Sequence, residues 1–207
     1  MKYAVKEIFG PTIQGEGSYA GLPVMFIRFA GCNRWTGREE DRAKATCWFC
    51  DTDFYKGEQL TAADIIARLQ DLEPVPNVVI SGGEATLQLN AHLLQTLTDY
   101  GYKLHLETNG STDISDFEHF FTHITMSPKQ PPTKTKLKGA NKVKILFPPP
   151  IADVTPAAFQ SFNAKRLFLQ PVDGPNLKQN TALAVQYCLR NPEWSLSVQL
   201  HKILEVK

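Results

Sequence analysis

The sequence predicts an α/β fold: a single domain over residues 1–207 that forms a partial, open (β/α) barrel of about six parallel strands. A chain of 207 residues fits one hydrophobic core. Apolar runs typical of buried strands alternate with segments of helical periodicity, and this order favours parallel strands joined by helical crossovers. About six strands are fewer than the eight that close a full barrel, so we expect an open sheet edge.

The predicted elements follow in order along the chain. Buried strands are expected at residues 24–29, 77–81, 103–107, 123–126, 142–147 and 166–170, with a shorter last strand at 196–200. Helices are expected from the cap residue Thr61 to about Leu72, from Leu87 to about Tyr100, where Gly101 ends the helix, and from Lys178 to about Leu189. A polar insertion at residues 33–46 and a loop rich in proline and lysine at residues 130–138 break the alternation.

Composition and charge argue against several classes of partner. The formal net charge is only +1, so no global field would attract nucleic acid or a membrane surface. No apolar run approaches the ~20 residues that cross a bilayer. Residues 1–7 lack the apolar stretch of a signal peptide, so we expect a cytosolic protein. The clustered lysines are expected on a solvated loop and strand face: Lys134, Lys136, Lys138, Lys142 and Lys144.

Polar residues follow five of the predicted strands. Because ligand sites of parallel α/β sheets lie beyond the carboxyl ends of the strands, these residues are expected to share one pocket. They are Arg28 and Cys32, Ser81 to Glu84, Glu107 to Asn109, Ser127 to Lys129, and Gln170 to Asp173.

Three of the four cysteines form a candidate metal site. Cys32, Cys47 and Cys50 have the spacing C-x14-C-x2-C directly after the first predicted strand. Cytosolic thiols stay reduced, so clustered cysteines favour metal binding over disulfides. From spacing alone, an iron–sulfur cluster and a Cys3His zinc site are equally plausible. Cys188 lies in a predicted helix and is expected to be a small buried apolar side chain.

The segment after the second strand separates these two alternatives. Ser81-Gly82-Gly83-Glu84 downstream of the cysteine triad resembles the radical S-adenosylmethionine superfamily, in which three cysteines hold a [4Fe–4S] cluster and S-adenosylmethionine chelates the fourth iron. In that superfamily the glycine pair lets the backbone approach the methionyl end of the cofactor. The sequence departs from the usual pattern twice: the first cysteine gap is 14 residues instead of three, and Ala85 stands where proline is usual.

Further segments along the whole chain resemble one family, the 7-carboxy-7-deazaguanine synthases, some of which share the enlarged cysteine gap. These segments are Thr12-Ile13-Gln14-Gly15-Glu16-Gly17, Cys50-Asp51-Thr52, Glu107-Thr108-Asn109-Gly110, Ser127-Pro128-Lys129, Gln170-Pro171 and Val198-Gln199-Leu200-His201-Lys202. The resemblance implies a radical lyase that converts 6-carboxy-5,6,7,8-tetrahydropterin to 7-carboxy-7-deazaguanine with loss of ammonia, for queuosine and related deazapurines. It implies a 5′-deoxyadenosyl radical, regeneration of S-adenosylmethionine in each turnover, and assistance by Mg²⁺.

The resemblance also implies roles for individual residues. Cys32, Cys47 and Cys50 would hold the cluster, and Thr52 would give an oxygen to Mg²⁺. The implied pterin contacts are Ile13, Gln14, Gly15, Glu16, Arg28, Ser81, His201 and Lys207. The implied S-adenosylmethionine contacts are Phe49, Gly82, Gly83, Glu84, Asn109, Ser127, Pro128, Lys129, Gln170, Pro171, Val172 and Asp173. No protein acid or base is implied as the catalytic group.

Arg28 carries an expectation of its own, because an unpaired cation inside an apolar strand is costly. Its guanidinium would bind the substrate carboxylate, or else an internal acid such as Glu16 or Glu107. The family expectation adds a homodimer that covers the open sheet edge and a flavodoxin-type electron donor. Two other functions remain open at this point: an activase that makes a glycyl radical on a partner protein, and a zinc-stabilised α/β binding module.

Overall fold

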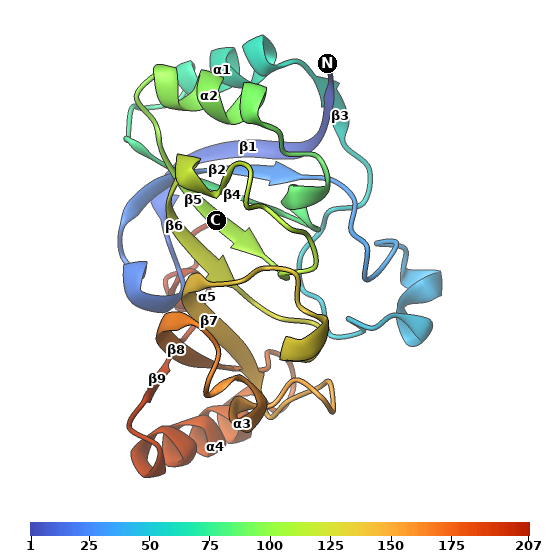
Figure 1. Ribbon diagram of the computed structural model, residues 1–207, viewed down its shortest axis with the longest axis vertical. Helices are drawn as coiled ribbons and strands as arrows, with labels where there is room; N and C mark the ends of the chain where they lie inside the picture. Colours follow the sequence, from blue (N-terminus) through green and yellow to red (C-terminus); the bar gives the residue numbers. More distant parts are fainter.

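The structure, a computed structural model of residues 1–207, contains a sheet of nine strands. Their bounds are β1 (Tyr3–Ile13), β2 (Pro23–Phe29), β3 (Glu58–Leu60), β4 (Asn77–Gly82), β5 (Lys103–Thr108), β6 (Phe121–Met126), β7 (Ala140–Phe147), β8 (Ala164–Pro171) and β9 (Trp194–Leu196). The strand order is β3-β1-β2-β4-β5-β6-β7-β8-β9 (Figure 1). Since β3 and β9 end the sheet without pairing to each other, the predicted open α/β barrel is confirmed.

Seven strands form the parallel part of the sheet, close to the predicted six. Strands β2, β4, β5, β6, β7, β8 and β9 pair in parallel, whereas β1 pairs antiparallel with both β2 and β3. Strands β1 and β3 were not predicted from the sequence. The register of β1 against β2 shifts twice, between Val5 and Glu7 and between Phe9 and Thr12, so β1 lacks a continuous two-residue periodicity.

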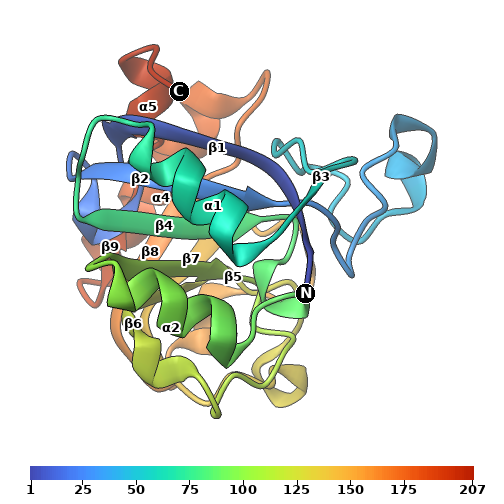
Figure 2. The ribbon, with the colours of Figure 1, turned by 90° about the horizontal axis from the view of Figure 1, so that it is seen from above.

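Five α-helices accompany the sheet: α1 (Ala62–Gln70), α2 (Ala91–Asp99), α3 (Pro156–Phe159), α4 (Leu177–Arg190) and α5 (Leu200–Ile203). Short 3₁₀ turns occupy Gly17–Tyr19, Glu39–Lys44, Ala85–Leu87, Glu118–Phe120 and Pro132–Lys134. Figure 2 shows α1 and α2 side by side over the same face of the sheet. No helix combines the length and the apolar character that a membrane crossing requires.

Local capping explains where two of these helices begin. Thr61 caps α1 as predicted, because its hydroxyl accepts from the Asp64 amide at 3.2 Å and the Asp64 carboxylate accepts from the Thr61 amide at 2.8 Å. The predicted start of the next helix at Leu87 is wrong. The Asn90 side chain accepts from the Leu93 amide at 3.0 Å, and this cap begins α2 at Ala91.

The two faces of the sheet have different chemistry. Apolar side chains on the helix side form a core of 30 buried residues that includes Val143 and Ile145 of β7. The alternate residues Lys142 and Lys144 lie inside the barrel and are only 3% and 6% exposed. The expectation that these two lysines lie on a solvated face is therefore wrong. The last strand, predicted at residues 196–200, is instead β9 at Trp194–Leu196, and Leu200 begins α5.

The insertion at residues 33–46 projects from the body of the molecule beside the cysteine loop (Figures 1 and 2). Arg42 attaches the insertion to this loop. Its guanidinium lies 4.2 Å from the centre of the Trp35 ring and donates to the carbonyl oxygens of Trp48 at 2.8 Å and Cys50 at 2.9 Å. The insertion thus fixes the backbone that carries two of the three clustered cysteines.

Candidate active site

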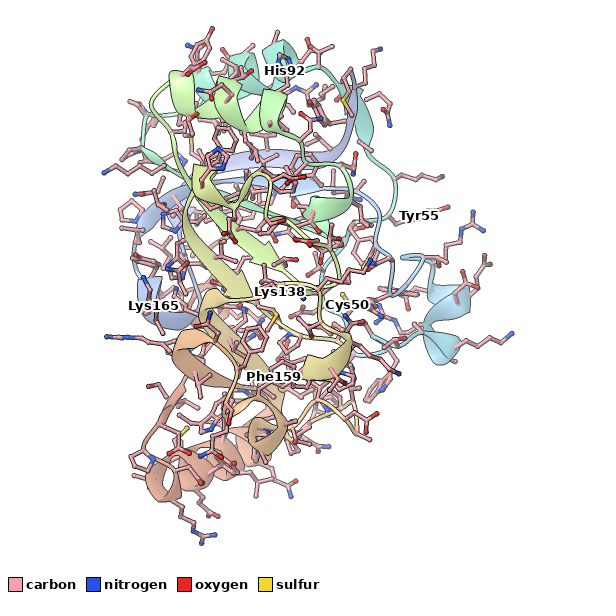
Figure 3. The ribbon with its side chains drawn as sticks, in the orientation of Figure 1. Cys50, Tyr55, His92, Lys138, Phe159 and Lys165 are labelled. Carbon is pink, nitrogen blue, oxygen red and sulfur yellow. The ribbon has the colours of Figure 1, made fainter.

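A cavity of about 310 Å³ lies at the carboxyl ends of the parallel strands and continues into the barrel interior. With two exceptions, every residue that the sequence analysis assigned to a ligand lines this cavity, from Ile13 at one end of the chain to Lys207 at the other. The exceptions are Glu84 and Pro128. Figure 3 shows that Cys50 lies between the sheet and the projecting insertion. Segments far apart in sequence therefore meet around one space, as predicted.

The three clustered cysteines are free thiols on one side of the cavity. Cys32 lies beyond the end of β2, and a backbone turn joins the other two, with the Cys50 amide donating to the Cys47 carbonyl at 3.0 Å. Burial raises the pKa of the Cys47 thiol to about 11, although the nearby Lys129 ammonium opposes the shift. Cys188 lies on α4, packs against the apolar core and does not line the cavity.

The three thiols line one side of the cavity and do not converge on a site for a single metal ion. No three His, Cys, Asp or Glu side chains lie close enough together to hold one metal ion. A Cys3His zinc site requires such a group, because its four ligands surround a single ion. In the cluster chemistry implied by the resemblance, each of three thiolates binds a separate iron, so the sulfurs need to surround a larger space.

The glycine pair after β4 has a role in packing. A Cβ atom at Gly82 would lie 2.1 Å from the Phe29 carbonyl oxygen, and one at Gly83 would lie 2.1 Å from the Gly31 carbonyl oxygen and 2.8 Å from Cys32 Cβ. Gly82 also has φ +141°, a conformation that side chains disfavour. The glycines let the end of β4 lie directly against the loop that carries Cys32.

Glu84 supports the cavity wall from behind. Its buried carboxylate accepts from the hydroxyls of Thr86 at 2.6 Å and Thr108 at 2.7 Å, and from the Asn109 amide at 2.6 Å. The Asn109 side chain in turn donates to the Asn33 amide oxygen at 3.1 Å. Through these hydrogen bonds, Glu84 holds in place the loop that lines the cavity.

Arg28 has a partner that the sequence analysis did not name. Its Nε lies 3.1 Å from Glu7 Oε1, but this buried atom makes no hydrogen bond, and neither Glu16 nor Glu107 pairs with it. The Lys207 ammonium lies 2.5 Å from the same Glu7 carboxylate, and both cations stand over the Phe9 ring. Two cations share one carboxylate, so this end of the cavity has an excess positive charge.

Glu16 is the centre of a second polar group. It follows β1, which runs antiparallel to its neighbours, so it enters the barrel from the opposite end to the cysteines. Its carboxylate accepts from the Lys144 ammonium, from Gln170 Nε2 at 2.9 Å and from Gln199 Nε2 at 3.0 Å. Burial alone would raise the pKa of Glu16, but the Lys144 charge and these hydrogen bonds lower it.

Glu107 faces the same ammonium from β5, with its Oε2 3.6 Å from Lys144 Nζ. Burial raises the pKa of this carboxyl, and Lys144 opposes the shift only in part. Burial alone would lower the pKa of Lys144, but Glu16 and Glu107 raise it above its ordinary value. The cavity thus contains one ion pair that stays charged and a second carboxyl that takes up a proton more readily.

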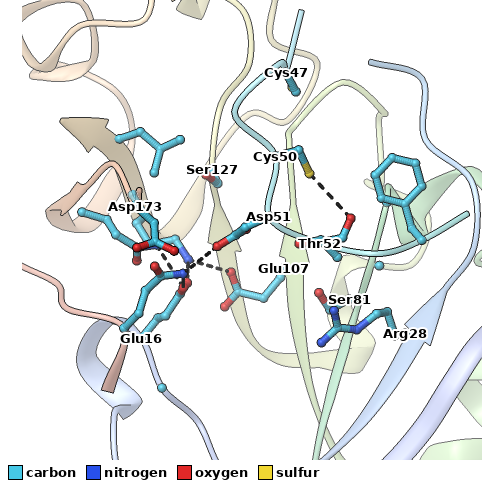
Figure 4. A pocket seen from close by; sticks show the side chains of 18 of the residues that line it. Glu16, Arg28, Cys47, Cys50, Asp51, Thr52, Ser81, Glu107, Ser127 and Asp173 are labelled. Carbon is cyan, nitrogen blue, oxygen red and sulfur yellow. Dashed lines mark hydrogen bonds and ion pairs between the residues drawn. The ribbon is translucent and has the colours of Figure 1, made fainter. Parts of the chain in front are cut away.

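Residues after β8 and β9 connect these groups to the cysteine loop. Lys202 Nζ lies 2.6 Å from both Asp51 Oδ2 and Asp173 Oδ2, and Gln199 Nε2 donates to Asp51 at 3.1 Å. Figure 4 shows Asp51 facing Glu16 and Asp173, with Thr52 on the side of Arg28 and Ser81. The sequence analysis missed Gln199 and Lys202 as site residues, although both flank His201 in a segment that it singled out.

Ser127 and Lys129 complete the cavity near the cysteines. The Lys129 ammonium donates to the Ser127 carbonyl at 2.7 Å and to its hydroxyl at 2.9 Å. Burial lowers the pKa of Lys129, while the neighbouring Cys47 opposes the shift. Lys129 therefore supplies positive charge beside the thiols, where thiolates would need it.

Comparisons with known proteins place the chain in a family, although it matches no protein-family model. Curated proteins named 7-carboxy-7-deazaguanine synthase match it over their full length. That of Bradyrhizobium diazoefficiens is 41% identical over 217 residues, and that of Burkholderia multivorans is 42% identical over 219 residues, each with 100% of both chains covered. A crystal structure of QueE from Escherichia coli has a TM-score of 0.71 at 22% identity, covers 97% of this chain and 95% of its own, and shows the same fold. The chain therefore belongs to the 7-carboxy-7-deazaguanine synthase family.

Proposed function

We propose that this chain is a radical S-adenosylmethionine lyase that converts 6-carboxy-5,6,7,8-tetrahydropterin to 7-carboxy-7-deazaguanine with loss of ammonia, in the biosynthesis of queuosine and other 7-deazapurines. The observation that carries this proposal is the full-length identity of 41–42% to proteins of that name. The cavity supports it, because residues from the whole chain meet there with the charges such a substrate needs. No observation favours a glycyl-radical activase or a zinc-stabilised binding module.

Cys32, Cys47 and Cys50 would hold a [4Fe–4S] cluster, with S-adenosylmethionine beside it. Together these groups would supply the reductive radical chemistry for hydrogen-atom removal from the substrate. The residues proposed to contact S-adenosylmethionine are Phe49, Gly82, Gly83, Asn109, Ser127, Lys129, Gln170, Pro171, Val172 and Asp173, all of which line the cavity. Glu84 would act indirectly, through its hydrogen bonds to Thr108 and Asn109.

The pterin would lie between the two charged groups of the cavity. Its carboxylate suits the excess positive charge of Arg28 and Lys207, whose shared partner Glu7 neutralises only one of them. Its N–H and NH₂ edge suits the Glu16 carboxylate, which lowering of the pKa keeps ionised. Ile13, Gln14, Gly15, Ser81 and His201 complete the proposed contacts, and each lines the same cavity.

Loss of ammonia would be assisted by a carboxyl group that holds a proton in the cavity. Glu107 offers this at its carboxyl oxygens, because burial raises its pKa. Lys144 stabilises negative charge on either neighbouring carboxylate, at 3.6 Å in the case of Glu107. The chain's own contribution is thus to bind, orient and shield the substrate, with proton storage at Glu107.

The same proposal includes Mg²⁺ and several partners. The Thr52 hydroxyl and the substrate carboxylate are suitable oxygen ligands for Mg²⁺, which keeps several waters. We further propose a single-domain cytosolic enzyme that receives electrons from a flavodoxin-type donor and works as a homodimer. The free edge of β9 and exposed apolar side chains on α4 support self-association; the latter are Leu177, Leu183, Val185 and Leu189.

The test is a turnover experiment without oxygen. Reconstituted protein is given S-adenosylmethionine, Mg²⁺, a reductant and 6-carboxytetrahydropterin, and the products are identified by mass spectrometry. Appearance of 7-carboxy-7-deazaguanine supports the proposal, and 5′-deoxyadenosine without it means another substrate. Cys47→Ala should reduce both products to background, whereas the matched Cys188→Ala variant should keep wild-type turnover because Cys188 lies outside the cavity.

A further inference from the structure

The segment of residues 199–202 contacts three parts of the cavity that are distant in sequence. Its backbone joins the pterin-side loop, since the Leu200 amide donates to the Gly15 carbonyl at 2.8 Å. Its side chains reach Glu16, Asp51 and Asp173, which lie respectively on the proposed pterin side, next to Cys50, and on the proposed S-adenosylmethionine side. No other short segment in the site makes ionic or amide contacts to all three of these carboxylates.

Lys202 joins two of the three parts. Its ammonium donates to Asp51 and to Asp173 at 2.6 Å each, so one cation holds the cysteine loop to the loop after β8. Lys202 is partly exposed, with 37% of its side chain accessible, and such ion pairs contribute little to global stability. The value of this contact lies in fixing the relative position of two ligand-binding loops.

Gln199 joins the pterin-side loop to the cysteine loop, because its side-chain amide donates to a carboxylate on each. Its Nε2 carries two hydrogens, and the acceptors are Glu16 Oε1 at 3.0 Å and Asp51 Oδ2 at 3.1 Å. Both hydrogens are therefore in use. Any ligand that takes over Glu16 as an acceptor frees one of them and changes how Gln199 holds Asp51.

A pterin at Glu16 would cause this exchange. A carboxylate offers about four acceptor positions, and Lys144, Gln170 and Gln199 occupy three at Glu16. Two adjacent N–H donors from a pterin edge exceed what remains. Lys144 stays because it is charged, and Ser197 holds Gln170 in place by donating to its Oε1 at 3.2 Å. Gln199 is the donor that can leave, since Asp51 already accepts from it.

The packing against Gly15 shows that this segment sits close to the pterin-side loop. A Cβ atom at Gly15 would lie 1.9 Å from His201 Nδ1 and 3.0 Å from His201 Cβ. This close approach leaves no room for a side chain at Gly15, and the hydrogen bond from the Leu200 amide to the Gly15 carbonyl ties the start of α5 to this loop. Lys202 follows His201 in that short helix.

On these observations, and resting on the proposed function, we infer that Gln199 and Lys202 are positioning residues that couple pterin binding at Glu16 to the arrangement of the cysteine loop and of the S-adenosylmethionine side. Occupation of Glu16 shifts Gln199 toward Asp51, and Lys202 carries the change to Asp173. The enzyme thereby cleaves S-adenosylmethionine productively only when the pterin is in place. Neither residue touches the reacting atoms.

The experiment measures this coupling in the reconstituted holoenzyme. The Kd of S-adenosylmethionine is determined by calorimetry with and without 6-carboxytetrahydropterin, for wild type, Gln199→Leu, Lys202→Met and the control Lys178→Met on the exposed surface of α4. We expect the pterin to tighten S-adenosylmethionine binding at least about fivefold in wild type and in the control. In both other variants this factor should fall toward one, and the ratio of 5′-deoxyadenosine to 7-carboxy-7-deazaguanine should rise.

The outcomes separate the inference from the proposed function. Unchanged coupling in both variants, or none in a wild type that makes 7-carboxy-7-deazaguanine, overturns the inference and leaves the function intact. A wild type that makes no such product overturns the function itself. Should Lys202→Met lose its cluster absorbance or its circular dichroism, the nearly isosteric Gln199→Leu decides, because it removes only the amide.

Discussion

The barrel interior holds one lysine at the level of the cavity, Lys144, and another below it at the base, Lys142. Their pKa values shift in opposite directions. At the cavity level, Lys144 of β7 faces Glu16 and Glu107, and these carboxylates raise its pKa. Two residues earlier, at the base, Lys142 faces no carboxylate within ion-pair distance. It lies 4.3 Å from the centre of the Tyr19 ring, and burial lowers its pKa to about 8.

The histidines at the base follow the same rule as Lys142. The Tyr19 ring contacts His105 and His123 edge to face, with centroids 5.1 and 4.7 Å apart. Burial lowers their pKa values to about 4 and about 3, so both are neutral at pH 7. The base thus holds one cation among neutral aromatic rings without a carboxylate partner, whereas the cavity level pairs its cation with carboxylates. A buried lysine alone does not mark a ligand site; the carboxylates opposite it do.

The largest expected loss of stability comes from removing the ion pairs of Lys144 at the level of the cavity. Lys144→Met leaves the largely buried Glu16 and Glu107 without a cation, and removal of one partner from a buried ion pair costs about 3–5 kcal/mol. Urea denaturation of the cluster-loaded protein at pH 7 measures the free energy of unfolding. Lys144→Arg, which keeps the charge, should lose less. An equally small loss in both variants would mean that the pair is not a structural requirement.

The two carboxylates opposite Lys144 should respond differently to neutralisation. Glu16→Gln should destabilise by about 2 kcal/mol, because hydrogen bonds to a charged acceptor are lost. Glu16 has a lowered pKa, so its contribution is present above the ordinary value near pH 4.5 and is lost as the pH falls through the folded value. Glu107 has a raised pKa, which means that folding does not favour its ionised form. Glu107→Gln should therefore change the free energy of unfolding at pH 7 very little. Equal losses for the two variants would contradict the assignment of Glu16 as the paired carboxylate.

At the base, we expect substitution of the lysine to increase the free energy of unfolding instead of lowering it. Lys142→Met removes a cation that folding penalises, so we expect a gain of about 1 kcal/mol at pH 7, well below the full cost of its pKa shift because the aromatic contact is lost as well. The folded pKa near 8 lies below the unfolded value of 10.5, so between them the unfolded chain binds more protons and the penalty fades as the pH rises. The advantage of the variant should therefore be full below pH 8 and decline above it. Urea titrations at pH 7, 8 and 9 measure this difference, and a constant difference would contradict it.

Much of this contrast lies beyond what periodicity can predict. The alternation in residues 142–147 correctly predicts a strand with Val143 and Ile145 on its core face. It also places both lysines on the opposite face, which is commonly solvated in antiparallel sheets but covered in parallel ones. Here that face lines the interior of a barrel, and the partner that holds Lys144 there is Glu16, 128 residues away. Such a long-range pairing leaves no local signal.

The same reasoning explains which site residues were found from sequence. The cysteine loop and the strand ends carry short motifs, so Cys32, Gly82 and Asn109 were predicted, and the structure brings them to one cavity. Gln199 and Lys202 were missed because their carboxylate partners, among them Glu16 and Asp51, lie far away in the sequence and leave no local signal. The hydrogen bonds of Glu84 to Thr108 and Asn109 were not predicted, because these partners lie on another strand and the loop after it.

The smallest expected effect tests whether the base is held by ring packing or by the phenol of Tyr19. Tyr19→Phe keeps the ring over Lys142 and against both histidines, and no hydrogen bond of the Tyr19 hydroxyl is involved in these contacts. We therefore expect a change in the free energy of unfolding within about 0.5 kcal/mol, the usual range for substitutions that remove no such feature. Tyr19→Ala should lose more, because it removes the aromatic contacts, worth about 0.5–1.5 kcal/mol for each pair. If Tyr19→Phe were as destabilising as Tyr19→Ala, the contribution of Tyr19 would come from its hydroxyl, and ring packing would not be what stabilises the base.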